Sequence, residues 1–426
     1  MPSVELDTAG VGARRAALQM LDAVLRQGKT LDAAAQQFHA NTGDRAAADQ
    51  GLAIAIAGEA LRRLPDLDAL IDSATPRPLP SDSKARMVLR LALAQKIGLG
   101  TPDHALVATA LPLVDGGPRR LVHGVLGTLL RKGIPAVEAP RLPEPVERRW
   151  SVAWGDPTVE AARRQIARRP PLDLSFADDA AAQAYAAAHG GVSLAPRHVR
   201  LPESSAVPAL AGFGEGAWWV QDLAASLPAR MIPADAADVL DLCAAPGGKT
   251  MQLAAAGHRV TAVDASKNRL ARIRENLQRT NLSATLVPVD ALTWQPGRMF
   301  DAILLDAPCS ATGTFRRHPE VLYRARPQVI AGSADQQARL LERAAAWLNP
   351  GGALVYSVCS LEYEEGEAIV TAFLASRPDF RLDRPGDLPT FVIPDAAGRL
   401  RILPGLIEDR GGLDGFFAAR LVRTAG

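Results

Sequence analysis

Two cysteines in the C-terminal half of this 426-residue chain stand where a thiol could do chemistry. Cys309 follows a predicted strand over residues 300–306, and Cys359 ends another over 353–359. Neighbouring parallel strands end at the same edge of a sheet, so both thiols are expected at one rim. A free cysteine is usually a small core hydrophobe, but its thiolate is also a strong nucleophile. The pair therefore predicts covalent catalysis.

The third cysteine opens a glycine-containing loop after another strand of the same sheet, predicted over 238–242. The backbone of such a loop can approach a bound molecule closely, because glycine has no side chain to hold the ligand away. The loop and the lysine that ends it form the predicted cofactor site. Its members are Cys243, Ala244, Ala245, Pro246, Gly247, Gly248 and Lys249.

Three kinds of nucleotide-type ligand compete for this loop. A dinucleotide site needs G-x-G-x-x-G, which is absent. Gly248-Lys249-Thr250 fits the end of a phosphate-binding P-loop, but Cys243 replaces its first glycine and Pro246 lacks the N–H that would bind a phosphate. S-adenosylmethionine has no phosphate and needs close approach and carboxylates, so the loop favours this cofactor.

Carboxylates end the next three strands. Asp264 is placed to bridge ribose hydroxyls, Asp290 to reach the adenine edge, and Asp306 closes the strand before Cys309. A single aspartate at a strand end is more often a helix cap or a turn former, but three around one glycine loop are a more specific signal. Asp241, inside the strand before the loop, is expected to support the loop structurally.

The elements that position these residues alternate between strand and helix, as in a doubly wound, Rossmann-like α/β sheet. A late strand over 416–422 is expected to be antiparallel, at or near an edge. Residues 1–135 instead show apolar residues at helical spacing and predict an all-α domain. Residues 136–169, rich in proline and arginine, are expected to form a linker. Residues 170–234 are expected to form a small α+β subdomain that leads into the catalytic domain 235–426.

Two thiols beside a sulfonium cofactor suit methylation of cytosine. Carbon 5 of cytosine is a poor nucleophile, but a thiolate that adds to carbon 6 turns the ring into an enamine, whose carbon 5 can attack the methyl group of a sulfonium. A second group must then assist removal of the carbon 5 proton and expulsion of the thiol. An acid near ring N3 would stabilise the adduct.

Several runs of residues resemble the RNA cytosine-C5 methyltransferases. Residues 240–250 are similar to the cofactor motif of that family, and 306–319 to its two-cysteine substrate motif. Residues 220–222 and 414–417 match as well, and the resemblance extends over 170–426. The N-terminal helices resemble the NusB RNA-binding fold. This combination is typical of the bacterial RsmB (Sun/Fmu) type, which methylates small-subunit (16S) ribosomal RNA.

The resemblance implies catalytic roles by position. Cys359 would be the nucleophile, and Cys309 would assist release of the methylated product. Asp306 would contact the target cytosine and lie beside the cofactor. Lys249 would serve the catalytic face, or would only be a solvated lysine at a helix start.

The resemblance also implies how S-adenosylmethionine is held. The loop from Cys243 to Lys249 would bind it together with Asp264, Asp290 and Asp306. Arg269 would assist the cofactor, or would only lie on an exposed helix surface.

Three positions depart from the family pattern. Val358 stands where threonine or proline is common before the nucleophile, and Gly366 stands where asparagine is frequent. Both would alter loop detail near Cys359. Asp173 replaces a frequent arginine in the lead-in strand, which puts one expected RNA contact in question. None of the three removes a thiol or a cofactor carboxylate.

Contact with RNA is expected from arginines, because aromatic residues are only 5% of the chain and a broad stacking platform is not expected. The expected RNA-binding residues are Arg148, Arg149, Arg163, Arg164, Arg316 and Arg317. For the first four, a solvated helix face beside a linker is the alternative interpretation.

Composition sets the remaining expectations. With 48% apolar residues and a net charge of +2, the chain is a folded protein whose charge alone demands neither nucleic acid nor membrane. No stretch is typical of a transmembrane helix or a signal peptide, and the spacing of the three cysteines predicts no disulfide framework and no metal site. We therefore expect a cytoplasmic protein, and nothing demands more than a monomer. The resemblance implies that its partner is 16S ribosomal RNA, free or partly assembled.

Other functions stay open at this point. The same chemistry could act on another RNA such as tRNA. A non-catalytic RNA-binding or assembly factor could retain the fold, although it would have no need of two thiols at strand ends. A P-loop phosphotransferase is disfavoured by Cys243 and Pro246. A DNA cytosine methyltransferase is disfavoured because it would use a single cysteine, at the position of Cys309.

Overall fold

The chain forms two compact units in the computed structural model. The model describes residues 10–42, 47–135, 137–202, 207–386 and 388–425. One unit comprises 1–169 and 315–325, and the other comprises 170–314 and 326–426. Among the described residues, no helix is both long enough and apolar enough to cross a bilayer.

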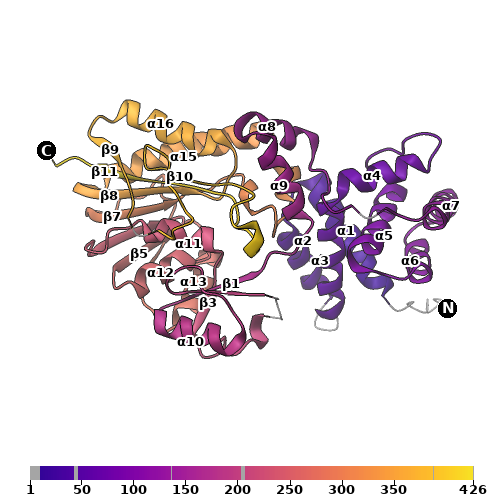
Figure 1. The fold of residues 1–426 in the computed structure, drawn as a ribbon, viewed down its shortest axis with the longest axis horizontal. Helices are drawn as coiled ribbons and strands as arrows, with labels where there is room; N and C mark the ends of the chain where they lie inside the picture. The colour runs from indigo at the N-terminus through magenta and orange to yellow at the C-terminus, as the bar shows by residue number, and fades with distance from the viewer. Residues whose placement is uncertain (1–9, 43–46, 136, 203–206, 387, 426) are drawn as a thin grey trace. The chain divides into compact units, whose positions relative to one another are not determined.

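The first unit is helical (Figure 1). Its helix α5 (Lys84–Leu99) is buried on all sides, since every residue from Ala85 to Gln95 is buried. The helix begins at Ser83, whose hydroxyl accepts a hydrogen bond from the N–H of Arg86. The all-α prediction is confirmed. The other helices before residue 135 are α1 (Val11–Gln27), α2 (Leu31–Thr42), α3 (Ala47–Arg62), α4 (Leu64–Ser73), α6 (Asp103–Ala110) and α7 (Gly116–Lys132).

Most of the segment 136–169, which was expected to form a linker, is helical. It forms α8 (Glu144–Trp154) and α9 (Asp156–Ile166), which pack within the same helical unit. Each helix has its proline in the first turn, where the missing N–H costs no helical hydrogen bond. Trp150 and Ile166 are buried, so apolar burial and not proline content decides the structure here.

A short segment that begins inside the substrate motif, Phe315–Ala325, belongs to the helical unit. The ring of Phe315 lies 5.6 Å from that of Trp150 in α8. Within the segment, α14 (Val321–Arg324) is anchored by Tyr323, whose hydroxyl donates to the carbonyl of Leu61 at 2.8 Å. Two further bonds in the unit join Arg324 to the Gly28 carbonyl and the Leu31 N–H to Glu320.

The second unit is built on a mixed sheet with the strand order β10-β11-β8-β7-β4-β5-β6, and β9 pairs with β11. Five strands run parallel, and β11 pairs antiparallel with β8, which confirms the Rossmann-like fold and its late antiparallel strand. The strands are β4 (Asp238–Leu242), β5 (Arg259–Asp264), β6 (Thr285–Pro288), β7 (Phe300–Asp306), β8 (Leu348–Val358), β9 (Phe380–Asp383), β10 (Leu400–Ile402) and β11 (Phe416–Arg423).

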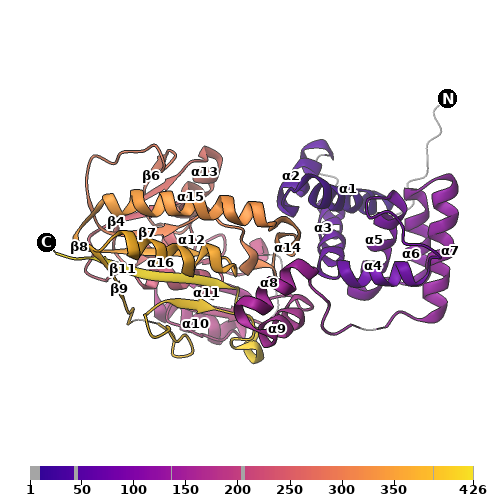
Figure 2. The ribbon, with the colours of Figure 1, turned by 90° about the horizontal axis from the view of Figure 1, so that it is seen from above.

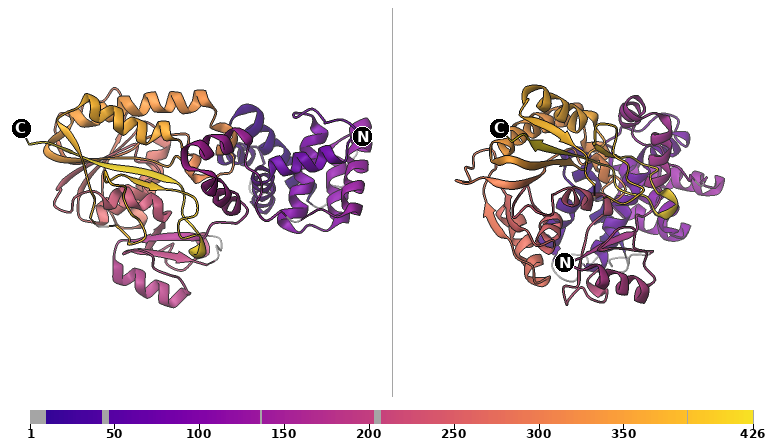
Figure 3. Two further views of the ribbon diagram at one scale, coloured as in Figure 1. Left: turned by 45° about the horizontal axis from the view of Figure 1, so that its top comes forward. Right: turned by 60° about the vertical axis from the view of Figure 1, so that its left-hand side comes forward.

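Successive side chains of the central strands point to opposite faces of the sheet, and each face has its own hydrophobic core. In β7, Ile303 and Leu305 join the core under α15 (Pro327–Ala346) and α16 (Glu367–Ser376). Leu304 points to the other core, under α11 (Leu223–Arg230) and α12 (Gly248–Ala255). Figures 1 and 3 show α15 and α16 on the opposite side of the strands from α11, and Figure 2 shows α15 and α16 from above. The remaining long helix, α13 (Lys267–Arg279), packs near β5 and β6.

The lead-in part of the second unit holds a three-stranded antiparallel sheet, in which Asp173 is buried. The strands are β1 (Leu172–Phe176), β2 (His198–Leu201) and β3 (Trp218–Val220), with α10 (Asp179–His189) beside them. Asp173 lies opposite Arg200, which donates to both carboxylate oxygens at 2.7 and 2.8 Å. Burial alone would raise the pKa of Asp173, but the hydrogen bonds from Arg200 and the His198 imidazole 3.4 Å away outweigh burial and lower it. Position 173, where the family often has arginine, is therefore occupied by an aspartate that forms a buried ion pair with Arg200.

Phe315→Ala should reduce the stability of the helical unit. Removing a fully buried phenylalanine typically costs about 3–5 kcal/mol, and Phe315 is fully buried beside Trp150. The unfolding midpoint of the full chain in urea would report the loss. The control is Val152→Ala, at an exposed position of α8, the helix that carries Trp150. This variant should change the midpoint little. Equal midpoints for both variants would show that the segment does not support this unit.

Candidate active site

The carboxyl ends of β4, β7 and β8 bring the three cysteine-bearing loops to one edge of the sheet. Leu242 pairs with Leu305, and Asp306 pairs with Ser357, so these strands end at nearly the same level. The Sγ atoms of Cys309 and Cys359 lie 3.5 Å apart. The structure thus brings together the two thiols that the sequence singled out.

The cysteines have different surroundings. The pKa of Cys309 lies well above its ordinary value because of the hydrogen bond with Cys359, then burial, then the charge of Glu365. Burial, followed by the charges of Asp306 and Asp264, raises the pKa of Cys243 to about 12. Cys309 and Cys243 are therefore protonated thiols at neutral pH.

Asp306 and Lys249 form an ion pair beside the thiols. Lys249 Nζ lies 2.8 Å from Asp306 Oδ2, and the Ser357 hydroxyl donates to Asp306 Oδ1 at 2.9 Å. Burial alone would lower the pKa of Lys249, but the charges of Asp306, Cys359 and Asp241 outweigh it and raise the pKa. The Lys249 side chain is 11% exposed, which does not fit a solvated lysine at a helix start.

The glycine loop has the strained backbone of a close-approach loop. Cys243 has φ +60° and Gly247 has φ +102°. The backbone angle of Gly247 favours glycine there, and an added Cβ would also lie only 3.1 Å from the Ile273 side chain. At the same loop the carboxylate of Asp264 accepts the N–H of Ala245 at 3.3 Å.

The Asp264 carboxylate also accepts the N–H of Ser266 at 2.8 Å and pairs with Arg269 at 2.9 Å. Arg269 lies on an exposed part of α13, yet it reaches the carboxylate that was predicted to bind the cofactor ribose. The structure therefore places Arg269 at the loop, in contact with Asp264.

Asp241 supports the loop from below, as expected. It is fully buried, and its Oδ2 accepts the Thr250 hydroxyl at 2.6 Å. Its Oδ1 is buried without a hydrogen-bond partner among the described residues. Burial raises the pKa of Asp241 to about 7, although the Thr250 hydrogen bond and the Lys249 charge oppose the shift.

Asp290 was predicted to end a strand, but it lies in the turn that follows the strand. Strand β6 ends at Pro288, and the exposed Asp290 accepts the N–H of Leu292 at 2.8 Å in the following turn. A proline cannot donate to the next ladder bond, which stops the strand early. In the structure, Asp290 therefore acts as a turn former.

The six arginines expected at RNA lie in different surroundings. Arg148 is exposed and pairs with Glu144, while Arg163 pairs with Glu147 at 2.6 Å. Arg149 donates to backbone carbonyls, Arg164 is exposed, and Arg317 is half-buried. Arg316 is only 2% exposed, which does not favour its expected contact with RNA. A local run of basic residues in the sequence does not indicate whether distant parts of the chain bury one of them, as happens to Arg316.

Sequence reasoning missed Glu365. This carboxylate is fully buried and accepts hydrogen bonds from Ser310 and Ser360, the residues that follow the two thiols. Only the run of acidic residues 362–367 marked the position, and a run of that kind usually indicates a solvated surface.

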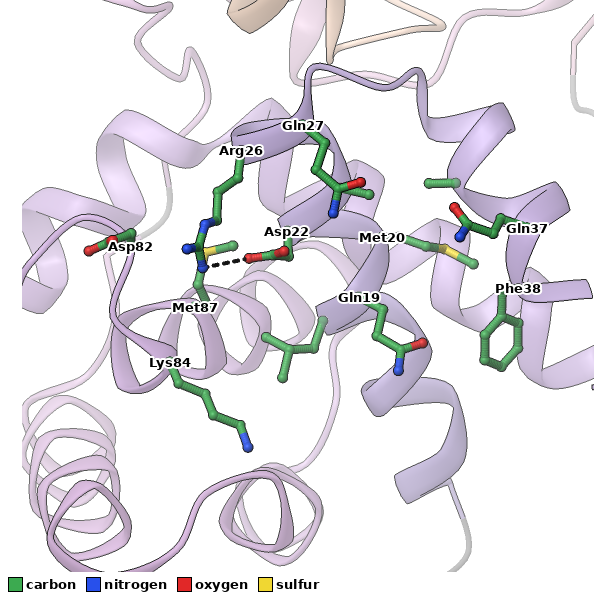
Figure 4. Close-up of a pocket in the computed structure, with 13 residues that line it drawn as sticks. Gln19, Met20, Asp22, Arg26, Gln27, Gln37, Phe38, Asp82, Lys84 and Met87 are labelled. Carbon is green, nitrogen blue, oxygen red and sulfur yellow. Dashed lines mark hydrogen bonds and ion pairs between the residues drawn. The ribbon is translucent and has the colours of Figure 1, made fainter. Parts of the chain in front are cut away.

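A cavity of about 550 Å³ lies in the helical unit and contains none of the predicted site residues (Figure 4). Met20, Phe38 and Met87 line it together with the Asp22–Arg26 ion pair, in which the charged atoms are 3.2 Å apart. It is lined only by residues of the helical unit, whereas the thiols belong to the second unit.

The glycine loop fits S-adenosylmethionine better than a phosphate. Pro246 offers no N–H, and the buried carboxylates of Asp241 and Asp264 underlie and flank the loop. Carboxylates at this position would repel phosphate but would accept hydrogen bonds from ribose hydroxyls.

Known proteins that are similar to this chain include ribosomal RNA methyltransferases. The NusB family model matches residues 12–131, and the model of the 16S rRNA methyltransferase RsmB/F family matches 229–422. The ribosomal RNA small subunit methyltransferase B of Xanthomonas campestris pv. campestris is 37% identical over 447 residues, covering 100% of both chains. That of Erwinia tasmaniensis is 32% identical, covering 96% of this chain and 97% of its own.

The chain belongs to the RsmB/F family of 16S rRNA methyltransferases. It is therefore a methyltransferase, and S-adenosylmethionine is its cofactor. Two solved structures share the fold: PH0851, with a TM-score of 0.72 at 24% identity over 98% of this chain and 99% of the other, and NSun6 from Pyrococcus horikoshii, with 0.57 at 20% identity over 67% and 99%. A P-loop phosphotransferase does not fit this family.

Replacing Asp241 should remove a pH dependence of stability. The folded pKa of about 7 lies above the unfolded value of roughly 4, so the folded state binds more protons in that window. The stabilising effect of the neutral carboxyl is present below pH ~4 and is lost as pH rises to about 7, by at most roughly 1.4 kcal/mol per pH unit. Asp241→Asn should be more stable relative to the parent at pH 8 than at pH 5.

Thermal unfolding midpoints at the two pH values would measure this difference. The control is Asp238→Asn, on the same strand. Hydrogen bonds from Arg259 hold the pKa of Asp238 low, so this variant should still lose stability between pH 5 and pH 8 as the parent does. An unchanged pH profile in Asp241→Asn would contradict the raised pKa.

Proposed function

We propose that the protein methylates carbon 5 of a specific cytosine in 16S ribosomal RNA through a covalent bond between Cys359 and carbon 6. The observation that carries the proposal is the pair of thiols 3.5 Å apart at the cofactor end of the sheet, beside the Lys249–Asp306 ion pair. Family membership supports a ribosomal RNA substrate, since the relatives are named for the small-subunit RNA.

The reaction begins when the Cys359 thiolate adds to carbon 6 and the displaced electron pair moves toward ring N3 and carbon 5. The charge that develops on the ring is negative, so the Lys249 ammonium can stabilise it directly. Asp306 can assist by holding Lys249 in place, or as a protonated acid that donates to ring N3. Bound S-adenosylmethionine, which the loop 243–249 and Asp264 would hold, would supply the electrophilic methyl group for carbon 5. The covalent step is useful because a neutral cytosine ring is too weak a nucleophile at carbon 5.

Release of the product requires carbon 5 to lose its proton to a base and the bond between carbon 6 and sulfur to break, which restores the ring double bond. Cys309 keeps its proton at neutral pH, because its pKa is raised. Its thiol can therefore donate a hydrogen bond to the Cys359 sulfur as that sulfur leaves as a thiolate. The different surroundings of the two thiols thus support different roles.

Cys359→Ala should abolish methylation, and Cys309→Ala should accumulate a covalent protein–RNA adduct because product release is impaired. The assay uses the full chain, unmethylated 16S RNA and cofactor labelled in the methyl group, with a denaturing gel for the adduct. The double variant Cys309→Ala/Cys359→Ala is the control and should form no adduct. Label in carbon 5 with Cys359→Ala, or no adduct with Cys309→Ala, would contradict the mechanism.

Recognition of the RNA by the helical unit is proposed to use the exposed Arg148 and Arg164. Charge reversal of both, Arg148→Glu/Arg164→Glu, should weaken binding and reduce the slope of log affinity against log salt by roughly one per lost phosphate contact. Filter binding at several salt concentrations would measure it. Arg381→Glu reverses an exposed arginine of the other unit and should have no effect. A double variant with the parent affinity and slope would show only a solvated helix face.

Substrate choice can be tested in the same assay. Methylation of 16S RNA but not of a tRNA pool would support the ribosomal substrate, and the reverse would assign the same chemistry to tRNA. Binding of 16S RNA by a protein that transfers no label under any condition would favour a non-catalytic assembly factor.

A further inference from the structure

We infer that Glu365 is a positioning residue that holds the two thiol-bearing loops in one arrangement, an inference that rests on the proposed function. Glu365 lies in the short turn Tyr363–Glu365 after β8 and is fully buried. The hydrogen bonds that the structure gives its carboxyl group go to Ser310, Ser360 and Gln337 and not to a sulfur, so its positioning effect passes through these neighbours.

The Glu365 carboxylate joins the loop after β7 to the loop after β8. Its Oε1 accepts the backbone N–H of Ser310 at 2.8 Å, and its Oε2 accepts the hydroxyls of Ser310 and Ser360. Ser310 follows Cys309 directly, and Ser360 follows Cys359 directly. One buried side chain therefore binds the residues next to both thiols.

Further bonds make this a closed network and not a single contact. Gln337 donates to the carbonyl of Pro308 at 2.8 Å and lies 3.5 Å from Glu365 Oε1. The Tyr356 hydroxyl donates to the Glu365 carbonyl at 2.6 Å and ties the turn to strand β8. A buried hydrogen-bond network specifies one arrangement more sharply than apolar packing does, and here every bond that reaches the Glu365 carboxylate comes from a donor.

A second set of bonds links the same two loops. The Gly313 N–H donates to the carbonyl of Cys359 at 3.0 Å, and the Leu361 N–H donates to the Thr312 hydroxyl at 3.0 Å. Glu365 is the central acceptor of this network, and every side chain or N–H that points at its carboxyl group is a donor. Removing it would leave buried donors without an acceptor, which costs more than the loss of a single solvated bond.

The distance between the two thiols gives a readout that does not depend on methylation. An added disulfide reagent can oxidise Cys309 and Cys359 to an intramolecular disulfide: two S–H bonds break, one S–S bond forms, and the reagent takes up the two electrons and two protons. Bridging at 3.5 Å between the sulfurs should be fast, and it should slow when the loops lose their arrangement.

The experiment compares Glu365→Ala, Glu365→Gln and Glu364→Ala in the full chain. We expect Glu365→Ala to slow both thiol bridging and methyl transfer by roughly 10²-fold, as small displacements of reacting groups do, while the KM for S-adenosylmethionine stays within about twofold. Glu365→Gln keeps an oxygen for the Ser310 N–H and should recover most of both rates. Glu364→Ala changes an exposed carboxylate next to it and should match the parent.

Unchanged bridging in a folded Glu365→Ala protein would overturn the inference, and so would lower activity accompanied only by lower thermal stability. If Glu365→Ala does not fold, Ser360→Ala removes one donor of the same network with a smaller loss, and parent-like bridging in that variant would overturn the inference equally. Bridging that depends on Glu365 in a protein that methylates no RNA would instead support the positioning role and contradict the proposed function.

Discussion

The parallel pairing of β7 with β4 on one side and β8 on the other is the constraint on which the active site depends. Three loops leave these strands at the same edge, and each carries one cysteine. Pairing alone brings the loops near one another, but it does not bring two sulfurs to 3.5 Å. That last step requires bonds between the loops, and a carboxylate between two serines provides them at a place that water does not reach.

The charges at the rim also depend on this edge. Asp241, Asp306 and Lys249 come from β4, β7 and the start of α12, and each changes the proton affinity of another. Lys249 stays charged in a buried place because carboxylates surround it, and Asp241 has a raised pKa because it is buried deeper, with one oxygen unpartnered among the described residues. The cofactor end of the sheet therefore holds both a fixed cation and a carboxyl group that titrates near neutral pH.

Much of the sheet could be predicted from the sequence, because its strands are short apolar runs bounded by turn residues. The ranges 238–242, 259–264 and 300–306 agree with the structure residue for residue. The linker could not be predicted from composition, since a proline in the first turn of a helix and a proline in a loop look alike in sequence. The pairing of Asp173 with Arg200 needs the register of two strands, and the burial of Arg316 needs the whole fold. Glu365 differs from Glu364 only in what surrounds it, so no local pattern separates them.

The path of the chain between β7 and α15 links the two parts of the protein. It leaves the catalytic unit after Thr314, contributes Phe315–Ala325 to the helical unit, and returns at Arg326. The loop that carries Cys309 is thus covalently continuous with a segment held by Trp150, Leu61 and Gly28 of the helical unit. Only residues 310–314 separate Cys309 from that segment. Within the catalytic unit the network around Glu365 fixes the same loop, because moving Ser310 away from Ser360 would leave a buried carboxyl group without its donors.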